Sequence, residues 1–155
     1  MDISIKKILC PVDFSEHSDH ALRYAAAFAS AYDAELEVFN VLEPPVLPSY
    51  STGGIPDLSQ AIERIKQDGQ QRLDELVEKL RQSHPRTVGR MVVGTPFVEI
   101  IERARGGNFD LIVIGTHGAS GLKHVLMGSV AERVVRKAPC PVLSVKHPGH
   151  EFVMP

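Results

Sequence analysis

Five short apolar runs, each separated from the next by a segment of helical character, constrain the fold of this chain more than any other feature. The runs lie at residues 3–12, 35–41, 87–93, 110–114 and 141–146. Strands that alternate with helices in this way predict right-handed crossovers and a parallel sheet covered on both faces. We therefore expect a doubly wound α/β fold with a five-stranded parallel sheet and four main helices.

The expected helices begin next to residues that can cap them. The helical segments lie at residues 21–29, 58–82, 96–105 and 129–138. The segment Asp13-Phe-Ser15 offers capping chemistry ahead of the first helical segment, and Thr95 places a hydroxyl before Pro96, a residue suited to the first helical turn. Ser129 is followed three residues later by Glu132, which is a capping-box pattern.

Residues 43–57 interrupt this alternation. They contain several residues that break regular structure: Pro44, Pro45, Pro48, Pro56, Gly53 and Gly54. Prolines and glycines at this density predict an irregular loop, and loops of this length are usually functional or mobile. The role of this loop stays open.

Length and charge narrow the possible classes of function. A chain of 155 residues with 43% hydrophobic content can build one compact core, so we expect a single domain over residues 1–155. The formal net charge is -2, and basic residues are scattered among acidic ones, which argues against binding to DNA or RNA. No run approaches the ~20 apolar residues of a membrane span. We expect a soluble, cytoplasmic protein with no membrane partner.

The cysteines and histidines lack the spacing of metal ligands. Cys10 and Cys140 each precede a proline in an apolar run, so we expect buried free thiols. Four histidines lie near the segments of interest: His17, His20, His117 and His124. Because no cysteine or carboxylate cluster completes a site with them, we expect solvated or hydrogen-bonded histidines and no protein metal site.

A glycine-rich segment directly follows the most apolar run. Gly115 and Gly118 come after residues 111–114, and Gly128 and Ser129 follow nine residues later. Glycine lets backbone N–H groups approach an anion, and the N-terminus of a following helix adds unpaired donors. The segment therefore predicts a phosphate-binding loop of a nucleotide site. The alternative interpretation is that Ser129 only caps a helix and Gly128 only eases a turn.

Asp13 ends the first apolar run and has two possible roles. Its carboxylate can accept hydrogen bonds from ribose hydroxyls, or it can cap the helix that follows. The residues alone favour neither role. His117 and Lys123 are further candidates for contact with phosphate oxygens, although Lys123 can equally be an exposed loop charge.

The spacing of Gly115, Gly118, Gly128 and Ser129, Gly-x2-Gly-x9-Gly-Ser, resembles the ATP-binding signature of the universal stress protein family. Residues 8–13 and 138–145 resemble the opening and closing strands of that family, so the resemblance covers nearly the whole chain. It implies an adenine nucleotide alpha hydrolase-like fold that binds ATP, with any Mg²⁺ carried by the nucleotide. It also implies a stress-response or signalling role and a homodimer.

The resemblance further implies individual roles around the nucleotide. The glycine-rich loop and Ser129 hold the phosphates, Asp13 lies near the ribose and adenine, and Val41 supplies backbone contacts to adenine. The expected nucleotide-binding residues are Pro11, Val12, Asp13, Val41, Gly115, His117, Gly118, Gly128, Ser129 and Val130. No residue is assigned a catalytic role.

Three functions are consistent with these residues. The favoured one is an ATP-binding module that acts through nucleotide-dependent association with itself or with an unknown protein partner. The second is a slow ATPase or an autophosphorylating phosphotransferase, for which no base–nucleophile pair can be named. The third is a nucleotide-independent dimeric interaction protein, because an apolar strand at residues 141–146 could pair with a second copy at a sheet edge.

Other nucleotide- and phosphate-handling classes are disfavoured by their missing motifs. The chain has no Gly-x4-Gly-Lys-Ser/Thr string of a Walker-type NTPase. Val93 and Gly94 stand where a receiver domain would carry its acceptor aspartate, and residues 11–15 replace the glycine fingerprint of a dinucleotide-binding oxidoreductase.

Overall fold

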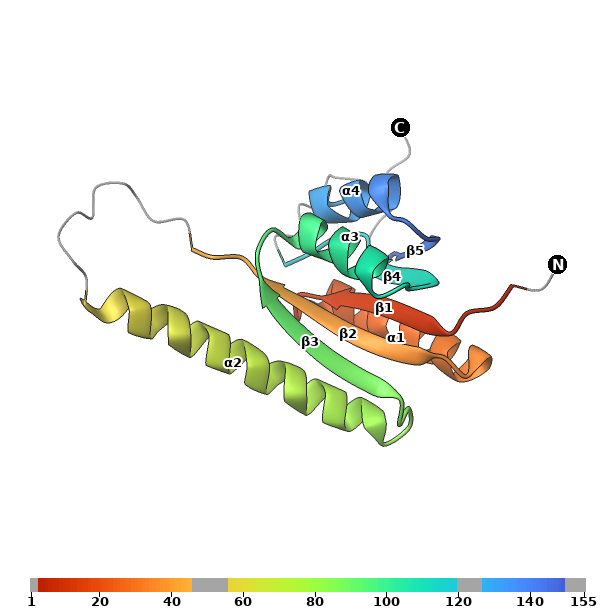
Figure 1. Ribbon diagram of the computed structural model, residues 1–155, viewed down its shortest axis with the longest axis horizontal. Helices are drawn as coiled ribbons and strands as arrows, with labels where there is room; N and C mark the ends of the chain where they lie inside the picture. The colour runs from red at the N-terminus through yellow and green to blue at the C-terminus, as the bar shows by residue number, and fades with distance from the viewer. Residues whose placement is uncertain (1–2, 46–55, 120–126, 150–155) are drawn as a thin grey trace.

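The computed structural model describes residues 3–45, 56–119 and 127–149, in which strands and helices alternate (Figure 1). The elements are β1 (Lys7–Val12), α1 (Glu16–Tyr32), β2 (Glu35–Leu42), α2 (Pro56–Arg81), β3 (Thr87–Val93), α3 (Pro96–Gly106), β4 (Leu111–Gly115), α4 (Ser129–Lys137) and β5 (Val142–Val145). The predicted alternation is therefore confirmed.

The strands form one parallel sheet in the order β3-β2-β1-β4-β5. The chain moves outward from β1 through β2 to β3, and after α3 it returns to the other side of β1 with β4. Neighbouring strands β1 and β4 thus form the topological switch point, where Ile8 pairs with Leu111. Ligands of doubly wound sheets bind beyond the carboxyl ends of strands at this point. The predicted fold class is confirmed.

Helices cover both faces of the sheet, and alternate strand residues face one layer or the other. On one face, Ile8 of β1 packs in a core with Leu22 of α1 and Leu73 of α2. On the other face, Leu9 packs with residues of α3 and α4, among them Ile100. Burial on both faces explains why the strands are continuous apolar runs.

The first strand is shorter than the sequence predicts, because β1 begins at Lys7 and not at residue 3. The pairing of β1 with β2 starts where Lys7 faces Glu35, so the preceding residues lie ahead of the sheet, and Ile3 is 80% exposed. The backbone N–H groups of Lys6 and Lys7 donate to the Asp110 carboxylate at 2.8 and 2.9 Å. At this end of β1, the Asp110 carboxylate thus accepts the backbone hydrogen bonds that a neighbouring strand would otherwise accept.

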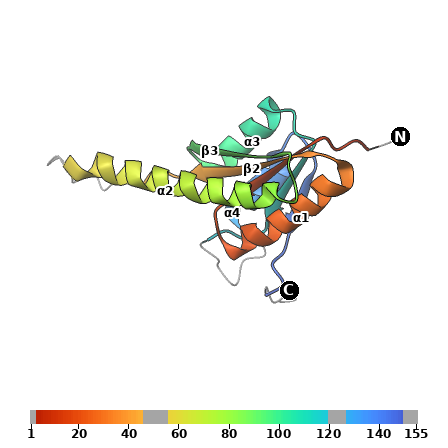
Figure 2. The ribbon, with the colours of Figure 1, turned by 90° about the horizontal axis from the view of Figure 1, so that it is seen from below.

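Helix α2 is longer than the sheet that it covers. Both views show its first half running past the end of the sheet, while its second half lies along β3 (Figures 1 and 2). Accordingly, Leu73 and Val77 are buried and Ile65 is 46% exposed. The helix begins at Pro56, so the predicted loop was too long at its end, and residues 46–55 lie outside the described residues.

The helix starts confirm one predicted cap and correct two others. Ser15 caps α1, because its hydroxyl accepts from the Ser18 N–H at 3.2 Å. Thr95 occupies the N-cap of α3 but makes no capping bond with its side chain. The capping-box prediction for Ser129 is wrong: extended Gly128 is the N-cap, Ser129 is the first helical residue, and Glu132 pairs with Arg136 at 2.7 Å. A capping box needs its serine one position earlier.

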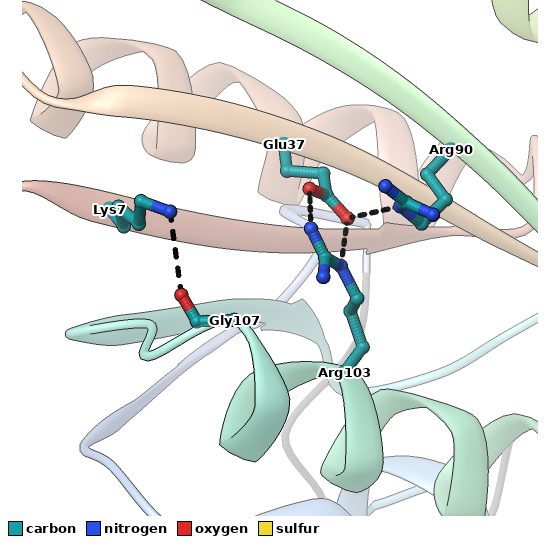
Figure 3. Close-up of polar contacts among 5 residues, drawn as sticks. All are labelled: Lys7, Glu37, Arg90, Arg103 and Gly107. Atoms are coloured by element: carbon teal, nitrogen blue, oxygen red, sulfur yellow. Dashed lines mark hydrogen bonds and ion pairs between the residues drawn. The ribbon is translucent and has the colours of Figure 1, made fainter.

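A buried carboxylate joins α3 to the sheet (Figure 3). Glu37 of β2 is only 2% exposed and receives two hydrogen bonds from the Arg103 guanidinium, at 2.6 and 2.5 Å. Arg90 of β3 approaches the same carboxylate at 3.6 Å. Near this cluster, the Lys7 ammonium group donates to the Gly107 carbonyl at 3.5 Å. The bidentate pair with Arg103 is the geometry that offsets the cost of burying a carboxylate.

Both cysteines are free thiols, but only one is fully buried. Cys10 lies in β1, and burial raises the pKa of its thiol far above the ordinary value. Cys140 is partly exposed, which corrects the expectation that both thiols are buried, and burial together with the Asp110 charge raises its pKa. Neither thiol is thus inclined to ionise at neutral pH.

Candidate functional site

A cavity of about 360 Å³ opens at the carboxyl ends of β1 and β4, where the strand order reverses. Its wall includes all ten residues predicted for the nucleotide site: Pro11, Val12, Asp13, Val41, Gly115, His117, Gly118, Gly128, Ser129 and Val130. They come from the end of β1 and the residue after it, from β2, from the end of β4 and the segment after it, and from the start of α4. The tertiary structure thus brings together residues that the sequence spreads over nearly 120 positions.

Asp13 joins β1 to the segment that follows β4. One carboxylate oxygen, Oδ1, accepts from the Ser15 N–H at 3.1 Å and from the Ser15 hydroxyl at 2.5 Å. The other, Oδ2, accepts from the Ala119 N–H at 2.7 Å. A Cβ atom at Gly118 would lie 2.8 Å from Oδ2, closer than real contacts allow. A larger residue at position 118 would therefore displace the Asp13 carboxylate.

The hydrogen bonds also set the charge of Asp13. Partial burial acts to raise the pKa of its carboxyl group. Hydrogen bonds from Ser15 and Ala119, with a smaller contribution from Ser18, outweigh this effect, and the pKa is lowered. The carboxylate is therefore ionised at neutral pH. An anion at this position repels phosphate and accepts hydrogen bonds from hydroxyl groups.

Backbone groups of the glycine-rich segment line the cavity next to Asp13. The Gly128 N–H donates to the Thr116 carbonyl at 2.6 Å, which draws the start of α4 against the end of β4. A Cβ atom at Gly115 would lie 2.9 Å from the His17 carbonyl oxygen, so this position needs glycine. The first turn of a helix presents N–H groups without partners in the helix, and these groups attract anions. Residues 120–126, with the candidates Lys123 and His124, lie outside the described residues.

Another part of the cavity wall is apolar, and it is supported by a side chain that the sequence did not single out. Phe39 and Val41 of β2 and Ile100 of α3 contribute to this wall. Asn40 lies between Phe39 and Val41, is 6% exposed, and donates from its side-chain amide to the Val12 carbonyl at 2.8 Å. This bond ties the ends of β1 and β2 together. An asparagine inside an apolar strand was the available signal, because a buried amide needs hydrogen-bond partners.

His117 is buried, and its ring faces other histidines. Its Nδ1 lies 3.0 Å from the Thr116 hydroxyl, and its ring centroid lies 5.4 Å from that of His17 in α1. The ring centroid of His147, which follows β5, lies 5.2 Å from that of His17 and 5.6 Å from that of His20. Within the described part of the chain, no group of three or more histidine, cysteine or acidic side chains is arranged to hold a metal ion. The cavity wall is therefore in contact with a histidine cluster through His117.

Among the described residues, no helix is long and apolar enough to cross a membrane.

Comparison with known proteins identifies a family that this chain matches. Residues 4–146 match the family model described as the universal stress protein family. Universal stress protein MJ0531 of Methanocaldococcus jannaschii is 37% identical over 146 residues, which cover 94% of this chain and 85% of that protein.

Solved structures match the fold over most of both chains. The universal stress protein UspA from Lactobacillus plantarum has a TM-score of 0.82 at 24% identity and covers 93% of this chain and 99% of its own. A universal stress protein solved in complex with cAMP has a TM-score of 0.64 at 26% identity, with coverage of 92% and 97%.

Proposed function

Since the chain belongs to the universal stress protein family, we propose that it binds an adenine nucleotide, with ATP as the expected ligand, in the cavity at the carboxyl ends of β1 and β4. The observation that carries the proposal is the position of Asp13, whose ionised carboxylate meets the backbone of the glycine-rich segment at Ala119. A carboxylate that accepts hydrogen bonds, together with backbone N–H groups that donate them, matches a ligand that carries both hydroxyl groups and phosphates.

Different parts of the cavity wall suit the ribose, the adenine and the phosphates of such a nucleotide. Asp13 accepts hydrogen bonds from the ribose hydroxyls, and the apolar wall with Val41 takes the adenine. The phosphates lie at Gly115, Gly128 and the start of α4, where glycine permits close approach and the helix dipole favours negative charge. Mg²⁺ accompanies the phosphates as part of the ligand. The solved complex of a 26% identical family member with cAMP supports an adenine nucleotide.

The proposed activity is binding without efficient turnover. Phosphoryl transfer requires a group that orients the attacking water or hydroxyl. The carboxylates among the described residues of the cavity wall are Asp13 and Glu43, and the proposal places Asp13 at the ribose hydroxyls and not at the phosphates. We therefore favour a module whose nucleotide occupancy changes its association with itself or with a protein partner. A slow ATPase is the second candidate.

Calorimetric titration of the Gly118→Ala variant tests the site. The new Cβ would meet Asp13 Oδ2 at 2.8 Å, so we expect ATP affinity to fall about tenfold, the equivalent of roughly 1.4 kcal/mol. Gly106→Ala is the matched control, because its Cβ has no heavy atom within 4 Å, and it should bind like the wild type. Equal ATP affinity in the two variants would contradict the site.

The same titrations separate the functional candidates. ADP, AMP, cAMP and GTP, each with and without Mg²⁺, define the preferred nucleotide, and phosphate release is followed in parallel. Saturable binding with negligible release supports the binding module, whereas rapid release supports the ATPase. A wild-type protein that binds none of these nucleotides would overturn the proposed function and favour the nucleotide-independent interaction protein.

A further inference from the structure

Phe14 has a backbone conformation that its side chain disfavours. Its φ angle is 60°, in the left-handed region that a bulky residue rarely adopts. The residue lies between Asp13 and Ser15, whose side chains are joined by a hydrogen bond of 2.5 Å. A strained residue at this position needs support from its surroundings.

That support comes from α2. The Phe14 ring is half-buried against the core beneath α1 and α2, and the Arg72 guanidinium lies 4.3 Å from the ring centroid. Asp19 and Leu76 help to enclose the same small depression. A cation over an aromatic face and an apolar floor both hold the ring in place. The ring thus ties the turn after β1 to the middle of α2.

The turn at Phe14 determines where the Asp13 carboxylate lies. The left-handed residue reverses the chain sharply, so that the Ser15 N–H reaches back to Asp13 Oδ1 at 3.1 Å. With Oδ1 held in this way, Oδ2 faces the Ala119 N–H at 2.7 Å. A change of φ at residue 14 moves the Ser15 N–H relative to Asp13 Oδ1, so the conformation of Phe14 and the position of the carboxylate are coupled.

We propose that Phe14, held by Arg72 of α2, is a positioning residue that keeps Asp13 oriented for the nucleotide. The inference rests on the proposed nucleotide-binding function and adds a route from α2 to the binding site. Phe14 acts through the turn and not by contact with the ligand. The fraction of molecules with a competent Asp13 then scales the apparent affinity.

Two substitutions of Phe14 separate the backbone from the ring. Phe14→Ala and Phe14→Gly both remove the ring, but only glycine adopts the left-handed conformation without a steric penalty. We expect Phe14→Ala to weaken ATP binding about fivefold and Phe14→Gly to recover most of that loss. If the wild type binds ATP, equal affinities in the two variants would overturn the proposal, because a purely structural role of the ring affects both alike.

A measurement without nucleotide keeps this test independent of the proposed function. Carboxyl ¹³C NMR follows the titration of Asp13, whose pKa is lowered by hydrogen bonds that depend on the turn. The pKa should rise toward the ordinary aspartate value in Phe14→Ala and remain low in Phe14→Gly. If wild type binds no nucleotide and this difference is present, the nucleotide function fails while the positioning role holds. An unchanged Asp13 pKa in Phe14→Ala would contradict the positioning role.

Arg72 provides the second arm of the experiment. Arg72→Gln removes the cation above the ring and should weaken ATP binding about twofold to fivefold, by lowering the population of the left-handed turn. Arg64→Gln, an exposed position on the same helix, is the matched control for the loss of one positive charge. The same affinity in both variants would exclude Arg72 as the support of the turn.

Discussion

At the level of single residues, Asp13 connects the chemistry of the cavity to the geometry of the chain. Its oxygens accept from Ser15 on one side and from Ala119 on the other, so one carboxylate links segments more than 100 residues apart. The sequence alone left Asp13 equally suited to a cap and to a ligand contact. The structure shows that it forms the local turn and also faces the cavity.

The lowered pKa of Asp13 predicts a pH-dependent contribution to stability. A group whose pKa is lower in the folded state stabilises the fold above its unfolded pKa, and this stabilisation is lost as the pH falls through the folded pKa. Asp13→Asn should therefore lower the free energy of unfolding by about 1 kcal/mol at pH 7. Urea unfolding should show this difference shrinking below about pH 4. A difference that is the same at pH 7 and at about pH 3 would contradict a role for the ionised form.

At the level of elements, the attachment of α3 to the sheet depends on a charge that is buried in β2. Glu37 lies among apolar neighbours and is satisfied chiefly by Arg103 of α3 (Figure 3). Hydrogen bonding to Glu37 raises the pKa of Arg103, so this side chain stays charged. Because Ile100 of the same helix lines the cavity, the ion pair also helps to hold the wall of the candidate site.

The two arginines around Glu37 should contribute unequally to stability. Arg103→Ala removes a bidentate partner from a buried carboxylate and should destabilise the protein by about 3 kcal/mol. Arg90, whose side chain is 53% exposed, makes a longer contact, and Arg90→Ala should cost less than about 1 kcal/mol. Chemical unfolding of both variants measures the difference. Similar losses of unfolding free energy in the two variants would contradict a larger contribution from the bidentate pair.

At the level of the whole molecule, β5 ends the sheet on the side of β4. The carbonyls of Pro141 and Val145 accept hydrogen bonds from the backbone of Ile112 and Thr116 in and after β4. Because the residues of a parallel strand direct their backbone groups alternately to either side, Ser144 directs its N–H away from β4. Among the described residues, no strand pairs with this edge of β5, which supports the proposal of a homodimer through β5.

The Ser144→Pro variant tests this dimer without disturbing the sheet. Proline removes the outward N–H and is tolerated at a sheet edge, so the pairing of β5 with β4 should persist. We expect light scattering to give the mass of a dimer for the wild type and of a monomer for the variant. Circular dichroism confirms that the variant is folded. A wild-type monomer, or a variant that remains dimeric, would contradict pairing through β5.

The sequence by itself determined the alternation of strands and helices, because apolar runs and helical spacing are local signals of burial. It also marked the glycine-rich segment, in which a Cβ atom at Gly118 would lie 2.8 Å from Asp13 Oδ2. Local patterns misplaced element ends: β1 starts later than expected and Gly128, not Ser129, caps α4.

Only the tertiary structure decided which residues lie together. Glu37 and Arg103 are 66 positions apart, and no spacing in the sequence connects them. The left-handed turn at Phe14 depends likewise on α2, whose Arg72 packs on the aromatic ring. Such contacts depend on the strand order and on the packing of helices across the sheet, which are interactions between distant segments. A local sequence pattern therefore does not predict these contacts.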